Sequence, residues 1–256
     1  MPRLTESEFE DMKRRKVQVE VDGQAFWIAE GDYLLDEAQL REWAEGPPDP
    51  REGLVAMDFG EGTVRWAPGV RLTYSVRRAS FGESEADYQQ AVVAMKEATQ
   101  DWMSICGCEF AHLAELDTAD TVRPNDAVFV VRRVMGGSNT IATAFFPYYE
   151  RPRRFVALFD GFFTPGLLFE PVGVLRHEMG HVLGFRHEHI RSGAPAACED
   201  ESLDHTINLT DYDPQSIMHY FCGGVGSHNL EFTDTDRESA RDVYGPPLFR
   251  FDLRRP

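Results

Sequence analysis

The sequence stretch that most restricts the fold is His177-Glu178-Met179-Gly180-His181, with Gly184 and His187 shortly after it. His177 and His181 are four residues apart, so on a helix both imidazoles lie on one face and reach one metal ion. Gly184 predicts the end of that helix, because glycine adopts left-handed backbone angles without penalty. The turn brings His187 back toward the other two histidines. The chain must therefore place a helix over 171–183 beside a third histidine.

These three histidines predict one catalytic zinc ion (Zn2+). Three neutral imidazole nitrogens leave the fourth position of a tetrahedral zinc open to water, as in catalytic rather than structural sites. Glu178 adjoins the first histidine, where its carboxylate can take a proton from that water as a general base. Zinc lowers the pKa of such a water and polarises a carbonyl group. The residues thus indicate hydrolysis by a metal-activated water.

A second motif, Ser216-Ile217-Met218-His219-Tyr220, follows downstream. An extended histidine motif with such a methionine turn is the signature of the metzincin proteases. The run Gly184-Phe185-Arg186-His187-Glu188 resembles the Gly-Phe-x-His-Glu run of the astacin branch, and Glu188 distinguishes it from matrixins, reprolysins and serralysins. The resemblance to astacin-like zinc metalloproteases covers about Gly53 to Gly245. The connection between the two motifs is shorter than in animal astacins, which is typical of a compact, bacterial-type member.

The resemblance implies a zinc-dependent endopeptidase that hydrolyses peptide bonds in proteins. Met218 is then the apolar floor of the zinc site. Tyr220 resembles the tyrosine that coordinates zinc at rest and stabilises the oxyanion during reaction. Glu188 resembles the residue that holds the new N-terminus after maturation; a solvated carboxylate at a helix end is the alternative.

The N-terminal part of the chain predicts a zymogen. Three prolines and two glycines among polar residues at 45–53 indicate a linker, which separates a pro-segment with its linker (1–53) from a catalytic domain (54–256). So short a segment buries little core and is expected to lean on the main body. Ala29-Glu30-Gly31-Asp32 resembles the astacin latency motif Phe-x-Gly-Asp, with Ala29 in place of the aromatic residue. Asp32 would occupy the zinc; a simple turn at Gly31-Asp32 is the alternative.

The stretch 140–147 predicts an edge strand, because it alternates weakly and ends in proline. In the family that it resembles, Ala142, Thr143, Ala144 and Phe145 form the rim of the cleft, where an extended substrate adds as a strand. An edge strand without a partner is equally compatible with this sequence. Three arginines follow at 151–154 and could favour acidic substrates, although solvated side chains explain them as well.

Hydrophobic periodicity predicts an α+β fold in which most strands precede the histidine helix. The predicted domain is metzincin-like, with a mixed twisted sheet, an active-site helix, a C-terminal helix and a cleft between two subdomains. Strands are expected at 71–76, 109–113, 127–131, 140–146 and 155–159, and helices over 84–105, 171–183 and 233–244.

The cysteines and the N-terminus bear on localisation. An even count of four cysteines without metal spacing is compatible with disulfides and an oxidising compartment, and buried free thiols are the alternative. Cys198 and Cys222 flank the connection to the methionine turn and are expected to form a bridge, whereas Cys106 and Cys108 stay unassigned because a one-residue spacer strains a mutual bridge. A secreted, extracellular protein is expected, although Met1 to Lys16 contain no readable signal peptide.

Composition excludes some partners. A net charge of −17 repels phosphate backbones, so nucleic acid is not an expected partner. The most apolar stretch, 155–169, is interrupted and too short to span a bilayer. Protein or peptide substrates are the expected partners, and a monomer is assumed. Two alternatives stay open: a zinc- or peptide-binding module without turnover, and a processing enzyme or toxin with one target.

Overall fold

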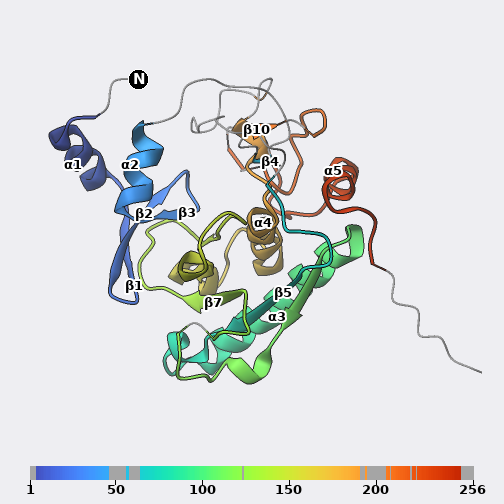
Figure 1. The fold of residues 1–256 in the computed structure, drawn as a ribbon, viewed down its shortest axis with the longest axis horizontal. Helices are drawn as coiled ribbons and strands as arrows, with labels where there is room; N and C mark the ends of the chain where they lie inside the picture. The colour runs from blue at the N-terminus through green and yellow to red at the C-terminus, as the bar shows by residue number, and fades with distance from the viewer. Residues whose placement is uncertain are drawn as a thin grey trace, which may run out of the picture.

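The computed structural model describes residues 4–45, 56–57, 64–122, 124–190, 194, 206–207, 209–219, 221–222 and 224–248. The helices and strands occur in the following order along the chain: α1 (Glu6–Arg15), β1 (Gln18–Val21), β2 (Gln24–Ala29), β3 (Tyr33–Leu35), α2 (Glu37–Glu45), β4 (Ala56–Met57), β5 (Arg71–Val76), α3 (Glu85–Ile105), β6 (Glu109–His112), β7 (Phe129–Arg133), β8 (Ala142–Thr143), β9 (Phe155–Leu158), α4 (Pro171–Leu183), β10 (Thr206–Ile207) and α5 (Asp234–Tyr244). Figure 1 shows α4 between the N-terminal elements, in blue, and α5, in red.

The main sheet has five strands in the order β6-β5-β7-β9-β8. The first four are parallel to their neighbours, and β8 runs antiparallel to β9 at the edge, through Ala142 opposite Leu158 and Thr143 opposite Ala157. Together with the helices, this mixed sheet confirms the α+β prediction. The antiparallel β8 leaves its other edge on the side where the N-terminal segment lies.

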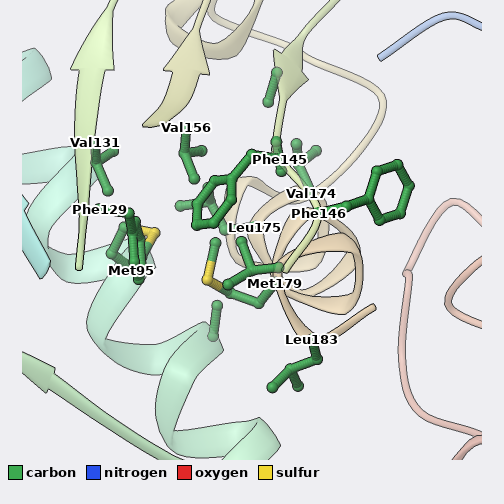
Figure 2. Packing of buried hydrophobic residues seen from close by; sticks show 14 of the residues in the cluster. Met95, Phe129, Val131, Phe145, Phe146, Val156, Val174, Leu175, Met179 and Leu183 are labelled. Atoms are coloured by element: carbon green, nitrogen blue, oxygen red, sulfur yellow. The ribbon is translucent and has the colours of Figure 1, made fainter. Parts of the chain in front are cut away.

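Helices α3 and α4 cover the sheet and pack on each other. Met95 of α3, Phe129 of β7 and Met179 of α4 are at most 1% exposed and belong to one apolar cluster, which Figure 2 shows between the sheet and α4. The indole Nε1 of Trp102 in α3 donates to the carbonyl oxygen of Arg176 in α4 at 2.8 Å. These buried apolar contacts hold α4, and hence its histidines, against the closely packed layer formed by α3 and the sheet.

The N-terminal elements form a small unit of their own. Strands β1, β2 and β3 make an antiparallel sheet flanked by α1 and α2. Its Val19 and Phe26 pack against Phe155 and Phe159 of the main body in a second apolar cluster, and Phe26 meets Phe155 edge-on at 5.7 Å between ring centroids. The segment therefore shares its core with the body, as expected for so short a stretch.

The elements differ from the sequence prediction at several points, and the helices and strands of residues 6–57 and strand β10 were not among those predicted. The strand expected at 127–131 is found at Phe129–Arg133, because the amide of Ala127 closes a turn onto the carbonyl oxygen of Pro124. Of the strand expected at 140–146, only Ala142–Thr143 pairs within the main sheet. Strand β3 was not expected between the Gly31 turn and α2. None of the described helices combines the length and hydropathy needed to cross a membrane.

Candidate metal centre

Helix α4 carries the first two histidines, and a glycine turn returns the third. Pro171 stands at its first turn, and Gly184 ends it with a φ of 100°. The amide of Phe185 bonds to the carbonyl oxygen of Gly180 at 2.9 Å. A Cβ on residue 184 would lie 2.5 Å from the carbonyl oxygen of Val64, so both backbone angle and space require glycine here. This local geometry places His187 beside His177 and His181.

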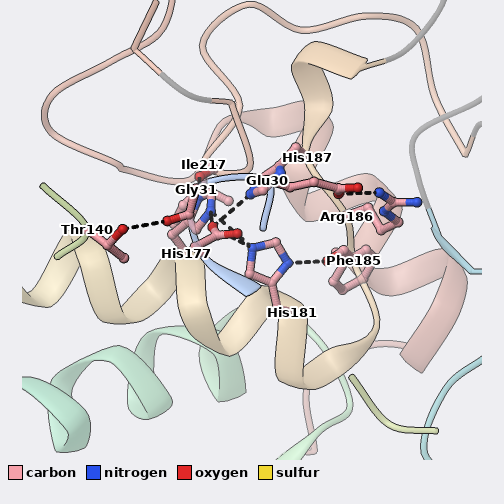
Figure 3. A network of polar contacts seen from close by, with 10 residues as sticks. Glu30, Gly31, Thr140, His177, His181, Phe185, Arg186, His187 and Ile217 are labelled. Atoms are coloured by element: carbon pink, nitrogen blue, oxygen red, sulfur yellow. Dashed lines mark hydrogen bonds and ion pairs between the residues drawn. The ribbon is translucent and has the colours of Figure 1, made fainter. Parts of the chain in front are cut away.

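The three imidazoles converge on the carboxylate of Asp32. Figure 3 shows His177, His181 and His187 close together above the histidine helix. The Nε2 atoms of His177, His181 and His187 lie 3.2, 3.2 and 2.8 Å from Asp32 Oδ2. The four ligand atoms are within 4.8 Å of one another, and all four residues are buried. The structure thus brings together the three predicted histidines and Asp32, which comes from the N-terminal segment.

Backbone carbonyl groups fix the tautomers of two of these histidines. His177 Nδ1 donates to the carbonyl oxygen of Ile217 at 2.7 Å, and His181 Nδ1 donates to that of Phe185 at 2.7 Å. With Nδ1 protonated, the Nε2 lone pair of a neutral imidazole points into the centre, which is the form that binds metal. Burial lowers the pKa of His181 to about 4, which keeps it neutral.

The carboxylate of Asp32 is also a suitable ligand for a cation. Burial alone would raise the pKa of Asp32, but His187 and His181 hold it well below its usual range. Asp32 Oδ1 is buried without a hydrogen-bond partner among the described residues. Three imidazole nitrogens and one carboxylate oxygen form a donor set for a four-coordinate zinc ion. The residues present therefore fit one divalent cation.

Glu178 adjoins this centre. It is 3% exposed, and its Oε2 atom is buried without a hydrogen-bond partner among the described residues. Burial, with repulsion from Asp32, raises its pKa well above the usual value. A cavity of about 180 Å³ opens beside it, and its lining includes Ile141, Val174 and Leu230. A carboxylate poised between this cavity and the histidines can exchange a proton with a molecule held there.

The methionine turn lies directly under α4. Gly180 has no side chain because a Cβ there would collide with the sulfur of Met218. Asp236 of α5 holds the turn: it accepts from Ser216 Oγ at 2.6 Å and from the amide of Ile217 at 3.0 Å. Sequence reasoning predicted the position of Met218 but missed Asp236. The signal was the Thr233-x-x-Asp236 pattern, which the structure shows as a capping box at the start of α5.

Glu188 links the third histidine to the methionine turn. It is fully buried, its amide donates to the carbonyl oxygen of Met218 at 2.8 Å, and its Oε1 accepts from the amide of Asp213 at 2.8 Å. The alternative of a solvated carboxylate is therefore wrong. Ion pairing with a new N-terminus stays a prediction.

The edge strand has the N-terminal segment as its neighbour. Tyr33 forms a parallel bridge with Ala144, and the Thr140 hydroxyl group donates to the carbonyl oxygen of Gly31 at 3.0 Å. Ala142 and Thr143 are buried in β8. Phe145 packs into the core against Phe129, with ring centroids 5.5 Å apart. This edge can therefore hold an extended peptide.

One tyrosine and three cysteines are the remaining residues for which an expectation follows from the sequence. Tyr220 and Cys198 lie outside the described residues, so their roles stay predictions. Cys106 and Cys108 are buried free thiols whose sulfur atoms are 3.7 Å apart. They form no mutual bridge, as the one-residue spacer indicates.

The histidine helix, the glycine turn and the methionine turn on a mixed sheet define the fold of the astacin-like metzincin zinc proteases. Among solved structures the chain is similar to myroilysin, with a TM-score of 0.51, 17% identity, and coverage of 72% of this chain and 97% of that one. A second similar structure is high choriolytic enzyme 1, a hatching enzyme zinc-protease of the medaka fish Oryzias latipes. It gives a TM-score of 0.47 and 18% identity over 74% of this chain and 98% of the other. No family model and no curated protein matches the chain. At this identity, the likeness to myroilysin concerns the fold.

Proposed function

We propose that the chain is a zinc-dependent endopeptidase made as a zymogen. One observation carries this proposal: three buried histidine Nε2 atoms surround one point, and the Glu178 carboxylate lies beside it at the wall of a cavity. Degenerate, non-catalytic members of enzyme families are expected to lose the general base, and Glu178 is present. The centre thus combines a metal-binding set with a group that can move protons.

His177, His181 and His187 would hold the zinc ion. When bound, zinc supplies a Lewis acid that polarises the scissile carbonyl group and makes water a better nucleophile. Glu178 accepts the proton of the attacking water and delivers it to the leaving amine. Its raised pKa suits both steps, since the carboxyl group must be able to keep the proton between them.

Further residues complete the proposed site. Met218 supplies an apolar floor below the histidines, and Tyr220 is proposed to donate a hydrogen bond to the developing oxyanion. The substrate adds as a strand to the edge that includes Ala142 and Ala144, a role supported by the bridge that Tyr33 makes there. Glu188 is proposed to bind the N-terminus that maturation creates.

Latency is proposed to come from Asp32. Its carboxylate fills the centre at which water must bind, and Gly31 and Tyr33 of the segment contact the edge that substrate needs. Cleavage in the linker before the catalytic domain 54–256 would release both, because exposed Pro- and Gly-rich linkers are preferred sites of proteolysis. Glu188 is fully buried in the full chain, so it would receive a new terminus only after a local rearrangement.

Secretion and one disulfide belong to this proposal. A bridge between Cys198 and Cys222 would stabilise the cleft wall by roughly 3 kcal/mol in the chain-entropy model. Mass spectrometry of unreduced peptides tests it, and free thiols at both positions would exclude it.

The decisive experiment is digestion of casein by the zinc-loaded chain after limited trypsin treatment, with and without a chelator. The proposal expects cleavage that the chelator stops and added zinc restores. Zinc binding without any cleavage would favour the alternative of a binding module.

A further inference from the structure

Two buried thiols lie side by side where α3 ends, and neither belongs to the histidine centre. Cys106 is 0% exposed and Cys108 is 7% exposed, and their sulfur atoms are 3.7 Å apart. Thiolates bind zinc at about 2.3 Å, so two thiolates on one tetrahedral ion are about 3.8 Å apart. The two sulfur atoms therefore already have the separation that one shared metal ion of similar size requires.

The backbone between the two thiols is fixed by the end of α5. The amide of Gly107 donates to the carbonyl oxygen of Gly245 at 2.9 Å. A Cβ on residue 107 would collide with the carbonyl oxygen of Tyr244, so only glycine fits between the two cysteines. Arg241 of α5 also donates from Nε to the carbonyl oxygen of Ile105 at 3.0 Å. The thiol pair is thus held in place before any ligand arrives, which lowers the entropic cost of binding.

The surroundings of the pair favour the loss of one thiol proton. The hydrogen bond between the two thiols lowers the pKa of Cys106 although burial opposes this, and the guanidinium group of Arg241 adds to the lowering. The same hydrogen bond and burial raise the pKa of Cys108. Because the thiolate is the form that binds metal, Cys106 is the first ligand, and Cys108 loses its proton when a cation arrives.

A cavity and a third sulfur atom adjoin the pair. Cys108 borders a cavity of about 350 Å³, which Met103, Phe110 and Leu248 also line. Met103 stands three residues before Cys106, on the same side of the last turn of α3. Its sulfur atom accepts from the amide of Phe110 at 3.3 Å. The cavity gives a small ion a route to Cys108, and the thioether of Met103 can supply a third soft ligand.

We propose that Cys106, Cys108 and Met103 form a second metal site, which binds one copper(I) ion. Within the part of the chain that the structure describes, Asp32 and the three histidines are the only group of three or more His, Cys, Asp or Glu side chains that can share an ion. The thiol pair therefore lacks the further nitrogen, oxygen or thiolate ligands that a four-coordinate zinc ion needs. Copper(I) prefers thiolates and thioethers, which are the ligands present here. Both thiol protons pass to solvent when the ion binds.

The test uses the zinc-loaded full chain, kept free of oxygen, and copper(I) delivered as its bicinchoninate complex. We expect the chain to take one copper(I) ion from the chelator while its zinc content stays unchanged. The double variant Cys106→Ser, Cys108→Ser should lose this uptake, and Met103→Leu should weaken the affinity at least about tenfold. The double variant Cys198→Ser, Cys222→Ser is the matched control, because it removes the same number of sulfur atoms elsewhere, and it should keep the copper.

X-ray absorption at the copper edge makes the outcome independent of how the cysteine variants fold. We expect sulfur ligands alone in the wild type, with a weaker sulfur signal in Met103→Leu. Nitrogen ligands would instead place the copper at the histidines and overturn the site. No uptake by the wild type, or uptake that is unchanged in the Cys106→Ser, Cys108→Ser variant, would overturn it as well. The proposed proteolysis does not enter any of these measurements, so the two proposals stand or fall separately.

Discussion

The helix that presents the histidines and the segment that covers them are held in different ways. Around α4, contacts are apolar and fully buried: Met179 and Val182 are 0% exposed, and Phe185 stacks on Trp102 at 5.6 Å. Glu30, Gly31 and Asp32 of the segment are held by polar contacts, whereas the neighbouring Tyr33 adds a strand bridge and packs on Phe146. Buried apolar packing fixes one arrangement, whereas a buried ion pair is lost when one partner is removed. The difference indicates a permanent centre under a cover that can be displaced.

The largest loss of activity is expected when the proposed general base, Glu178, is replaced. Glu178→Gln is isosteric and should lower kcat/KM of the matured chain by about 10²- to 10⁴-fold, because no group then takes the proton of the water. Zinc content, measured by atomic absorption, should stay near one per chain, since the histidines remain. His181→Ala, which removes a ligand, should lose both zinc and activity. Full activity in Glu178→Gln would exclude the assigned base.

The second prediction concerns latency, which the N-terminal segment is proposed to impose through Asp32. Asp32→Ala in the full chain should raise proteolysis before any maturation by at least about tenfold, the factor given by each 1.4 kcal/mol of lost ligand free energy. Glu20→Ala, at an exposed position of the same segment, is the matched control and should leave latency unchanged. The rate of fluorogenic peptide hydrolysis measures both. Equal latency in Asp32→Ala and the wild type would show that Asp32 does not block the site.

The contrast between the histidine helix and the covering segment also explains how much of the site could be predicted from the sequence. Helix α4 and its glycine end were placed correctly because a four-residue spacing and a left-handed turn are local properties. Asp32 was proposed from a short motif, and the structure places its carboxylate beside the three histidines. The Arg186–Glu30 pair and the Tyr33–Ala144 bridge were missed, because contacts between residues far apart in the chain leave no period in the sequence.

The methionine turn belongs to the permanently packed region around the histidine helix. Removing the side chain that supports this turn is expected to lower the stability of the chain by an intermediate amount. Asp236→Ala removes the acceptor of Ser216 Oγ and of the amide of Ile217, and leaves these buried donors unpaired. The free energy of unfolding should fall by about 3 kcal/mol, as for more than one unsatisfied group. Asp234→Ala, exposed in the first turn of the same helix, is the control and should change stability much less. Urea denaturation of the full chain measures both, and equal midpoints would contradict the role of Asp236.

The smallest change in stability is expected for the ion pair between Asp22 and Arg132, which joins the N-terminal segment to the main body. Asp22 accepts from Arg132 Nη1 and Nη2 at 2.6 and 2.7 Å, and it has a φ of 53°, which asparagine also tolerates. Asp22→Asn should therefore keep the turn but lose the charge and one of the two hydrogen bonds from Arg132, because an amide nitrogen cannot accept, at a cost of about 1–2 kcal/mol. Asp11→Asn removes a pair whose side chains are more than half exposed and should cost less than about 0.5 kcal/mol. Thermal melts of the full chain separate the two, and the Asp22→Asn deficit should disappear after maturation. A deficit that persists without the segment would place the effect in the main body and not in the cover.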